Sequence, residues 1–249
     1  MPTQRAAIVY GLLAGFLFAQ PGNSQQTEST KNAGPFAAPK PAVDLKPGTH
    51  RYEARLSLGD RNLTLKATTT IQDQGGEWLV TETADGPMGG ATEKTTIEKG
   101  TLIVHKRSIR EGPATVELEH SAGKLTGKMT LNDKEQTVDA KLQGELFADG
   151  AGAFDSIGCL PLAEGYTATY SNFNLLANKE KRLQLRVTGS ETISVPAGRF
   201  ETFRIELTSA DGGNDRATLW IAKDTRIPVK VSALMAEMGG ATMISELQQ

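Results

Sequence analysis

The chain has 249 residues, of which 38% are hydrophobic and 22% charged, and its 27 basic and 29 acidic side chains give a net charge of −2. This length is enough for one large or two small domains with a buried core. The charges are scattered, whereas a nucleic-acid-binding protein needs clustered basic residues to displace counterions from phosphates. The composition therefore argues against a nucleic-acid partner.

Residues 1–20 have the features of a signal peptide. Arg5 precedes an uncharged apolar run from Ala6 to Ala19, which is shorter than the roughly 20 residues that cross a bilayer as a helix. We predict cleavage near Ala19 or Gln20, which leaves no transmembrane segment and a periplasmic or secreted protein. An uncleaved membrane anchor is the alternative.

Residues 21–44 are rich in Pro, Gly, Ser, Thr and Gln and lack apolar periodicity. They predict a disordered or extended linker, followed by a single β domain over 45–249. Cys159 is the only cysteine, so no intramolecular disulfide can form and the core must hold the domain together. We interpret Cys159 as a small buried hydrophobic residue; a nucleophile and an intermolecular disulfide are the alternatives.

Beyond Leu45 the apolar residues alternate with a period of two, as in Leu183, Leu185 and Val187. This alternation indicates strands with one buried and one solvated face. Turn-forming sequences recur about every 8–12 residues, as expected for antiparallel hairpins. The predicted fold is all-β, or β-rich with one short helix, in a large antiparallel curved sheet or partly open barrel built from two related meander halves.

Residues 143–161 interrupt the alternation and carry few charges. They predict a link between the halves 45–142 and 162–249. A short helix is expected around Phe154 to Cys159, with Asp155 near its start and its end before Pro161.

The two halves resemble each other in sequence. The segment IEKGTLIVHK at 97–106 aligns with IAKDTRIPVK at 221–230, which indicates a repeated β-meander. The pentapeptide MGGAT occurs at 88–92 and at 238–242, but the two copies do not coincide in this alignment. We interpret it as a tight-turn sequence, because a Gly-Gly pair supplies positive φ angles, and not as a duplicated site.

The C-terminal half contains a characteristic succession of motifs. FDSIGCLPLAEG at 154–165 is followed by VPAG at 195–198 with Phe200, and then by the segment ATLWIAKDTRIPV at 217–229. This succession resembles the exported bacterial family called domain of unknown function 3108, best over residues 154–247. The resemblance implies a β-rich exported fold and no established activity. The link is shorter and richer in glycine than the family pattern.

No motif for catalysis or metal binding emerges from the sequence. It has no G-x-S-x-G, H-E-x-x-H, paired C-x-x-C or phosphate-binding loop. We expect His50, His105 and His120 at solvent-facing strand positions, and Glu117 and Glu119 on the solvated face. The prediction is therefore a non-enzyme with no catalytic residue, no metal and no cofactor; an enzyme is a minor alternative.

An outer-membrane barrel would also give alternation and export, but such barrels carry aromatic girdles around an apolar band. Aromatic residues make up only 6% of the chain, and threonine, lysine and glutamate dominate the outward positions. A soluble sheet is the favoured prediction.

The leading functional hypothesis is a module that binds a hydrophobic or lipid-like small molecule in a groove between the curved sheet and the link. The candidate groove-lining residues are Phe147, Phe154, Ile157 and Leu160, for which core packing is the alternative role. The competing hypothesis is a structural or protein-interaction module without a ligand pocket, whose partner is another envelope protein.

Overall fold

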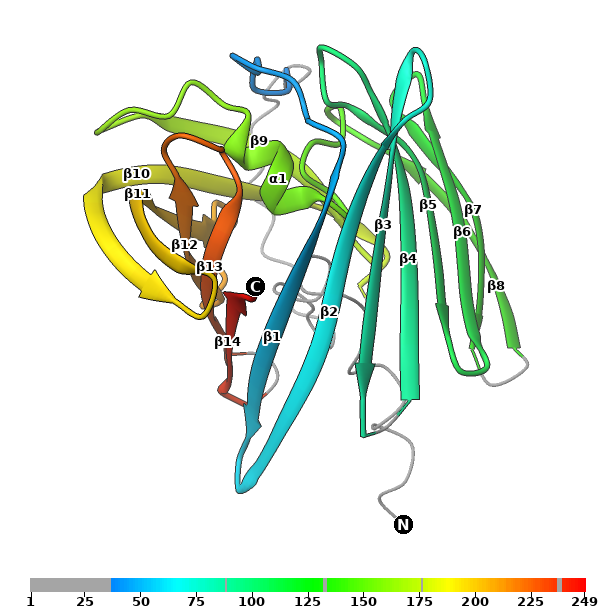
Figure 1. The fold of residues 1–249 in the computed structure, drawn as a ribbon. Helices are drawn as coiled ribbons and strands as arrows, with labels where there is room; N and C mark the ends of the chain where they lie inside the picture. The colour runs from blue at the N-terminus through cyan, green and yellow to red at the C-terminus, as the bar shows by residue number, and fades with distance from the viewer. Residues whose placement is uncertain (1–36, 88, 132–133, 176, 237–238) are drawn as a thin grey trace.

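The computed structural model describes residues 37–87, 89–131, 134–175, 177–236 and 239–249. These residues form one antiparallel sheet of 14 strands and a short helix (Figure 1). The strands before the helix are β1 (Gly48–Leu58), β2 (Arg61–Asp73), β3 (Glu77–Gly86), β4 (Gly89–Glu98), β5 (Val104–Glu111), β6 (Ala114–Ser121), β7 (Lys124–Leu131) and β8 (Lys134–Lys141). After helix α1 (Ala153–Gly158) come β9 (Thr167–Asn174), β10 (Lys179–Val195), β11 (Gly198–Ser209), β12 (Arg216–Ala222), β13 (Pro228–Met235) and β14 (Ala241–Leu247).

The order of the strands across the sheet is β8 to β1 followed by β14 to β9. Neighbours in the sheet are also neighbours in the chain, except at its centre, where the first strand pairs with the last. There Tyr52 of β1 lies opposite Leu247 of β14. Strands β8 and β9 are the two edges, so the sheet does not close into a barrel. The prediction of an all-β fold with an open, curved antiparallel sheet is confirmed.

The link between β8 and β9 runs through the concave side of the sheet. Figure 1 shows α1 between the strands of the two halves. The helix spans Ala153–Gly158 with Asp155 in its first turn, close to the predicted position. It follows Gly152, whose φ of 77° suits glycine, and no side chain caps it. A single large apolar cluster includes residues of both halves and of the link, so the domain has one main core.

The two halves contain a hairpin with the same irregularity. The pairing of β4 with β5 changes register between Thr96 and Ile97. The pairing of β12 with β13 changes register between Trp220 and Ile221. A β-bulge of this kind adds one residue to one strand and increases the local twist. The alignment of 97–106 with 221–230 therefore corresponds to matching bulged hairpins.

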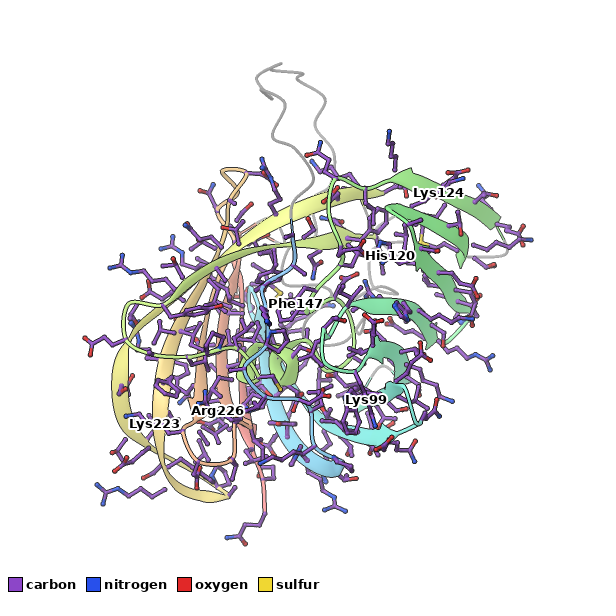
Figure 2. All side chains as sticks on the ribbon, turned by 90° about the horizontal axis from the view of Figure 1, so that it is seen from above. Lys99, His120, Lys124, Phe147, Lys223 and Arg226 are labelled. Carbon is purple, nitrogen blue, oxygen red and sulfur yellow. The ribbon has the colours of Figure 1, made fainter. Side chains whose placement is uncertain are left out.

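The turns of these two hairpins also match. Leu102 and Arg226 each lie five residues after the matched isoleucine and adopt positive φ angles of 57° and 67°. Lys99 lies over the ring of Trp78 at 4.3 Å, and Lys223 over the ring of Phe203 at 5.4 Å. In Figure 2, Lys99 lies on one side of the molecule, and Lys223 and Arg226 lie on the other. This correspondence supports a duplicated meander.

The two Gly-Gly pairs lie in hairpins that are not equivalent. The first pair begins β4, directly after the β3–β4 turn, and Gly89 has a φ of 119°. The second precedes β14, and Gly239 and Gly240 have φ angles of 73° and 78°. Both pairs therefore supply positive φ angles for turns, as the sequence indicated. Met88 and Met238 lie outside the described residues.

The fixed part of the chain begins before Leu45, in contrast to the predicted linker over 21–44. The amide of Ala42 donates to the carbonyl of Cys159 at 2.8 Å. The indole nitrogen of Trp78 donates to the carboxylate of Asp44 at 2.7 Å. The end of this segment thus joins the link to the sheet. The predicted signal peptide and residues 21–36 lie outside the described residues.

Gly158 of α1 provides a test of how tightly the link is seated. A Cβ atom at this position would lie 2.1 Å from the carbonyl oxygen of Arg226. We expect Gly158→Ala to lower the free energy of unfolding by about 2 kcal/mol or more, since overpacking displaces backbone. Urea denaturation measures this. Gly76→Ala is the control, because a Cβ atom there meets nothing within 4 Å; equal stability of the two variants would contradict the prediction.

Candidate functional site

The structure places the four predicted groove residues in different surroundings. Phe147, Ile157 and Leu160 are fully buried, and the ring of Phe147 packs edge-on against Tyr170 with centroids 5.6 Å apart. Figure 2 shows Phe147 near the middle of the molecule. Phe154 is half-buried and lines a cavity of only ≈ 20 Å³. In this structure three of the four residues therefore pack in the core, and Phe154 lines this small cavity.

The interior also contains charged side chains that the sequence analysis did not single out. We call the following five residues the buried charge cluster. All are at most 8% exposed: Glu82 of β3, Glu93 of β4, Arg107 of β5, and Asp149 and Asp155 of the link. Arg107 donates to Glu93 Oε1 at 2.8 Å and to Asp149 Oδ1 at 2.9 Å. One buried cation thus connects the sheet to the link.

A sequence signal for two of these residues exists. Glu82 continues the buried parity of Trp78 and Val80, and Glu93 continues that of Ile97. The two glutamates lie directly opposite each other on the concave face. A charged residue on the apolar parity of a strand is therefore the feature that would have indicated the cluster.

Arg107 faces inward because of the β-bulge in β5. Ile97 pairs with Val104, but Thr96 pairs with Lys106, so one residue is added between them. The bulge reverses the alternation, and Arg107, not Lys106, shares the concave face with Val104. Regular alternation from Val104 would have placed the guanidinium outside, so the sequence pattern alone could not locate it.

The cluster fixes an irregular stretch of backbone inside the sheet. The amide of Gly152 donates to Glu82 Oε1 at 2.9 Å. A Cβ atom on Gly150 would lie 2.6 Å from Arg107 Nε and 2.7 Å from both Glu93 Oε1 and Thr95 Oγ1. The lack of a side chain at Gly150 thus allows the link to approach the charged groups closely. The glycine-rich character of the link has its physical reason here.

Burial shifts the pKa values of the four carboxyl groups upward. Desolvation raises the pKa of Glu82 to about 8 and that of Asp155 to about 7. The pKa values of Glu93 and Asp149 are also raised by burial, although the charge of Arg107 opposes the shift. Glu82 is thus largely protonated at neutral pH, and Asp155 is close to half protonated.

The small cavity beside α1 has a mainly apolar wall with a few polar groups. It lies between the link and strands from both halves, and Tyr52, Thr69, Glu82, Asp155 and Ser245 contribute polar groups to its wall. The Tyr52 hydroxyl and Glu82 Oε2 are buried there without a hydrogen-bond partner in the protein. A volume of ≈ 20 Å³ accommodates a single water molecule. It does not accommodate an organic substrate.

The cluster has no equivalent in the second half. In the hairpin that matches β3–β5, the positions of Glu82 and Glu93 are occupied by Leu207 and Ala217, and that of Arg107 by Val231. All three replacements are buried and apolar. The duplicated fold therefore does not need these charges, which serve the link that packs against the first half.

The prediction of solvent-facing histidines is wrong for His120. This residue is 6% exposed, because it continues the buried parity of Val116 and Leu118 in β6. Its Nδ1 is 3.0 Å from the carbonyl oxygen of Val104. His50 and His105 are half-buried, and His105 Nδ1 is 2.8 Å from Glu77 Oε1. Glu117 and Glu119 lie on the exposed face, as predicted.

Cys159 is buried at the end of α1, as the sequence indicated. Desolvation, with a smaller contribution from Asp155, raises the pKa of its thiol to about 12. The thiol is therefore protonated at neutral pH, and a thiol is a poor nucleophile compared with a thiolate.

Two further properties concern the described residues. No group of three or more His, Cys, Asp or Glu side chains in this part of the chain is arranged to hold a metal ion. No helix in the described residues has the length and hydropathy needed to cross a bilayer.

The opposite, exposed face of β4 to β8 is hollowed into a groove of ≈ 640 Å³. Three exposed lysines and three exposed glutamates line it, and two oppositely charged pairs are in contact: Lys106 with Glu119 at 2.8 Å and Lys128 with Glu135 at 2.9 Å. We call this the charged groove; its exposed charged residues are Lys94, Lys106, Lys128, Glu117, Glu119 and Glu135.

Together these features define an open, duplicated antiparallel β-sheet protein with a buried link. The chain belongs to the family described as "Protein of unknown function (DUF3108)", which matches residues 50–244. The resemblance seen in the C-terminal motifs is thus confirmed and extends over both halves.

One of three similar solved structures shares the fold, at low sequence identity. A β-barrel-like protein of the DUF1849 family from Brucella abortus has a TM-score of 0.57 and 12% identity, covering 84% of this chain and 98% of that one. A Bacteroides fragilis protein described as "a putative exported protein with YmcC-like fold" has a TM-score of 0.32 and 8% identity, covering 84% of this chain and 98% of that one. A DUF1329 protein from Desulfovibrio piger has a TM-score of 0.29 and 11% identity over 82% and 85%. No curated protein matches the chain.

Replacing Arg107 tests whether the cluster fastens the link. Arg107→Met leaves Glu93 and Asp149 without a cation, and we expect a loss of about 3 kcal/mol in the free energy of unfolding. Arg55→Met is the control, since Arg55 is 57% exposed and pairs with Glu246 at the surface; it should change stability by less than about 1 kcal/mol. Chemical denaturation gives both values. A loss for Arg107→Met no greater than the control value would refute the anchoring role.

The raised pKa of Glu82 predicts a pH-dependent stability. Between its ordinary pKa of 4.5 and the folded value of about 8, the folded state binds a proton that the unfolded state has released. The contribution of protonated Glu82 to the free energy of unfolding is therefore fully present at low pH and is lost as the pH rises toward 8. Glu82→Gln removes this pH-dependent contribution and retains a carbonyl acceptor for the Gly152 amide. We expect the stability of this variant relative to wild type to increase from about pH 5 to about pH 8.

Urea midpoints measured across this range provide the comparison. Glu119→Gln is the matched control, because the Glu119 side chain is 66% exposed. It should follow the wild-type profile in shape. Parallel profiles for Glu82→Gln and wild type would show that Glu82 titrates normally in the folded state.

Proposed function

We propose that this chain is a non-enzymatic interaction module of the cell envelope, exported by residues 1–20 and acting through the outer face of its sheet. The observation that carries the proposal is how the described residues on the concave side pack. Phe147, Ile157 and Leu160 occupy the concave side, where the cavity beside Phe154 measures ≈ 20 Å³. Pockets for small molecules are typically about 300–1,000 Å³. The surface available to a partner is therefore external.

The charged groove supports this proposal by its size and chemistry. It is open to solvent over β4 to β8, and its lysines and glutamates offer charge-assisted hydrogen bonds of both polarities. Such a lining suits a polar polypeptide segment with mixed charges, and it does not suit an acyl chain. Complementary charges at an interface of this kind mainly determine specificity and the association rate.

A non-enzymatic role agrees with the surroundings of the reactive side chains. The Cys159 thiol is held protonated by burial. His120 is fixed inside the core by the Val104 carbonyl, with Nε2 3.3 Å from Glu145. Glu82 and Asp155, whose pKa values are raised, adjoin a cavity the size of one water molecule, which is too small for an organic substrate.

One observation favours a second candidate, a carrier of a hydrophobic ligand. The link covers the apolar concave face, and specific polar contacts hold it there, including Gly152 to Glu82 and Asp149 to Arg107. A segment held by a few polar contacts can leave as a unit, and its departure would uncover the apolar residues beneath it. In that case the link would act as a lid over the ligand site.

Site-specific photo-crosslinking in the cells that make the protein tests the interaction module. A photoreactive residue in place of Thr115, exposed in the charged groove, should give a discrete adduct with an envelope protein. Thr192, exposed on β10, is the control position and should give none. Lys94→Glu combined with Lys106→Glu should weaken the Thr115 adduct several-fold. Equal adducts from both positions, or insensitivity to the charge reversal, would reject the groove as the contact surface.

Organic extraction of the purified protein followed by mass spectrometry tests the carrier. The interaction module predicts no co-purifying lipid and no rise in melting temperature on addition of acyl compounds. A stoichiometric lipid, or a clear stabilisation by fatty acids, would instead establish the second candidate.

A further inference from the structure

We propose that β8 is a self-association edge, through which a second copy of this chain adds its own β8 in antiparallel orientation. Two sheets would thus join into one continuous sheet. The inference rests on the sheet edge alone and does not depend on the partner proposed for the charged groove.

The two edges of the sheet differ in how they are protected. Edge β9 is covered by the link: Leu146 forms a parallel bridge with Ser171, the amide of Phe147 donates to the Ser171 carbonyl at 3.1 Å, and Asn172 donates to the carbonyl of Ala148 at 3.0 Å. Edge β8 pairs with β7 alone among the described strands. In Figure 1, β8 forms the outer border of its half. Every second residue of β8 therefore directs its backbone N–H and C=O groups away from the sheet.

Strand β8 lacks several features that usually prevent edge-to-edge pairing. It has no proline, and its register with β7 is unbroken over eight residues, from Lys134 to Lys141. Its inward residues are Lys134, Gln136, Val138 and Ala140, and only Lys134, at the start of the strand, carries a charge. Inward charges, prolines and bulges are the common protective devices of edge strands. The three inward residues in the middle and at the end of β8 therefore present no charge to an added strand.

Among the registers that pair most of β8, the charges of the outward face favour one. Residues directly opposite each other in a continuous sheet must lie on the same face, because a slip by one residue exchanges the two faces. With the twofold axis at Val138, Glu135 lies opposite Lys141 of the second copy, and symmetry repeats this pair. Thr137 then lies opposite Asp139, and Val138 opposite its own copy.

The two neighbouring registers bring like charges opposite each other. An axis at Thr137 places Glu135 opposite Asp139 of the second copy, twice by symmetry. An axis at Asp139 places that aspartate opposite itself. Opposite charges across a strand pair contribute about 0.2–1 kcal/mol, and like charges destabilise it. The sequence of β8 is therefore self-complementary in the register centred on Val138.

Charge exchange between two variants tests the pairing. The wild-type chain should form a dimer in sedimentation equilibrium at micromolar to sub-millimolar concentrations. Glu135→Lys places lysine opposite Lys141, and Lys141→Glu places glutamate opposite Glu135, so each variant alone should self-associate about tenfold more weakly or worse. In an equimolar mixture both cross-strand pairs again join opposite charges, and the heterodimer should form with wild-type affinity.

Circular dichroism verifies that the variants are folded, which we expect because both side chains are exposed. A wild-type chain that stays monomeric, or variants that dimerise as tightly as wild type, would overturn the proposal. A mixture of the two variants that contains no more dimer than the separate variants would also overturn the proposal.

Cysteine crosslinking reports the register independently. Thr137→Cys and Asp139→Cys, mixed and oxidised, should form a disulfide-linked heterodimer. Crosslinking of Thr137→Cys with itself would indicate an axis at Thr137, and self-crosslinking of Asp139→Cys an axis at Asp139; either as the dominant product would overturn the register. The native Cys159 is 3% exposed and serves as the internal control, since wild type should not crosslink.

Discussion

An open sheet that curves must cover its own apolar concave face, and the link between β8 and β9 meets this requirement. Covering that face with irregular chain has a consequence, because its buried backbone amides need partners and the neighbouring strands supply only some of them. The carboxyl groups of Glu82 and Glu93 meet part of this need by accepting from the Gly152 and Ala151 amides of the link. Arg107 then offsets part of the negative charge. The buried charge cluster is therefore a result of placing a loop inside a β-sheet.

This constraint also separates the two halves. Both contain the bulged hairpin with a positive φ at the equivalent turn residue, but only the half that faces the link carries charges at the matched inward positions. The apolar Leu207, Ala217 and Val231 show what the same positions contain when no loop has to be satisfied. The strand arrangement is repeated in both halves, whereas the charges at these inward positions occur only in the half that contacts the link. A functional role for the interior thus has to involve the link, and the exterior remains the part of the molecule that is open to partners.

Much of the fold could be predicted from the sequence, because a period of two and regularly spaced turns are local properties. The helix near Phe154 and the repeat at 97–106 and 221–230 were visible for the same reason. The position of Arg107 was not, since it depends on one extra residue in β5 that reverses the alternation. Glu82, Glu93 and His120 had a signal in their parity with buried neighbours. The filled interior required knowledge of the path of the link, which no periodicity encodes. The groove predicted around Phe147 and Ile157 depended on that path.

The pairing of β1 with β14 makes the two ends of the domain into its centre, and the amide of Gln248 near the C-terminus donates to the carbonyl of Arg51 at 2.8 Å. Every other strand contact joins neighbours in the chain and can form as soon as both strands exist, whereas this one closes the largest possible loop. During synthesis β1 can pair with β2, but its other edge stays unpaired until β14 has been made. A chain that stops before β14 would leave an unpaired edge in the middle of the sheet and not at its border. Synthesis of the C-terminal strand is therefore needed to join the two halves.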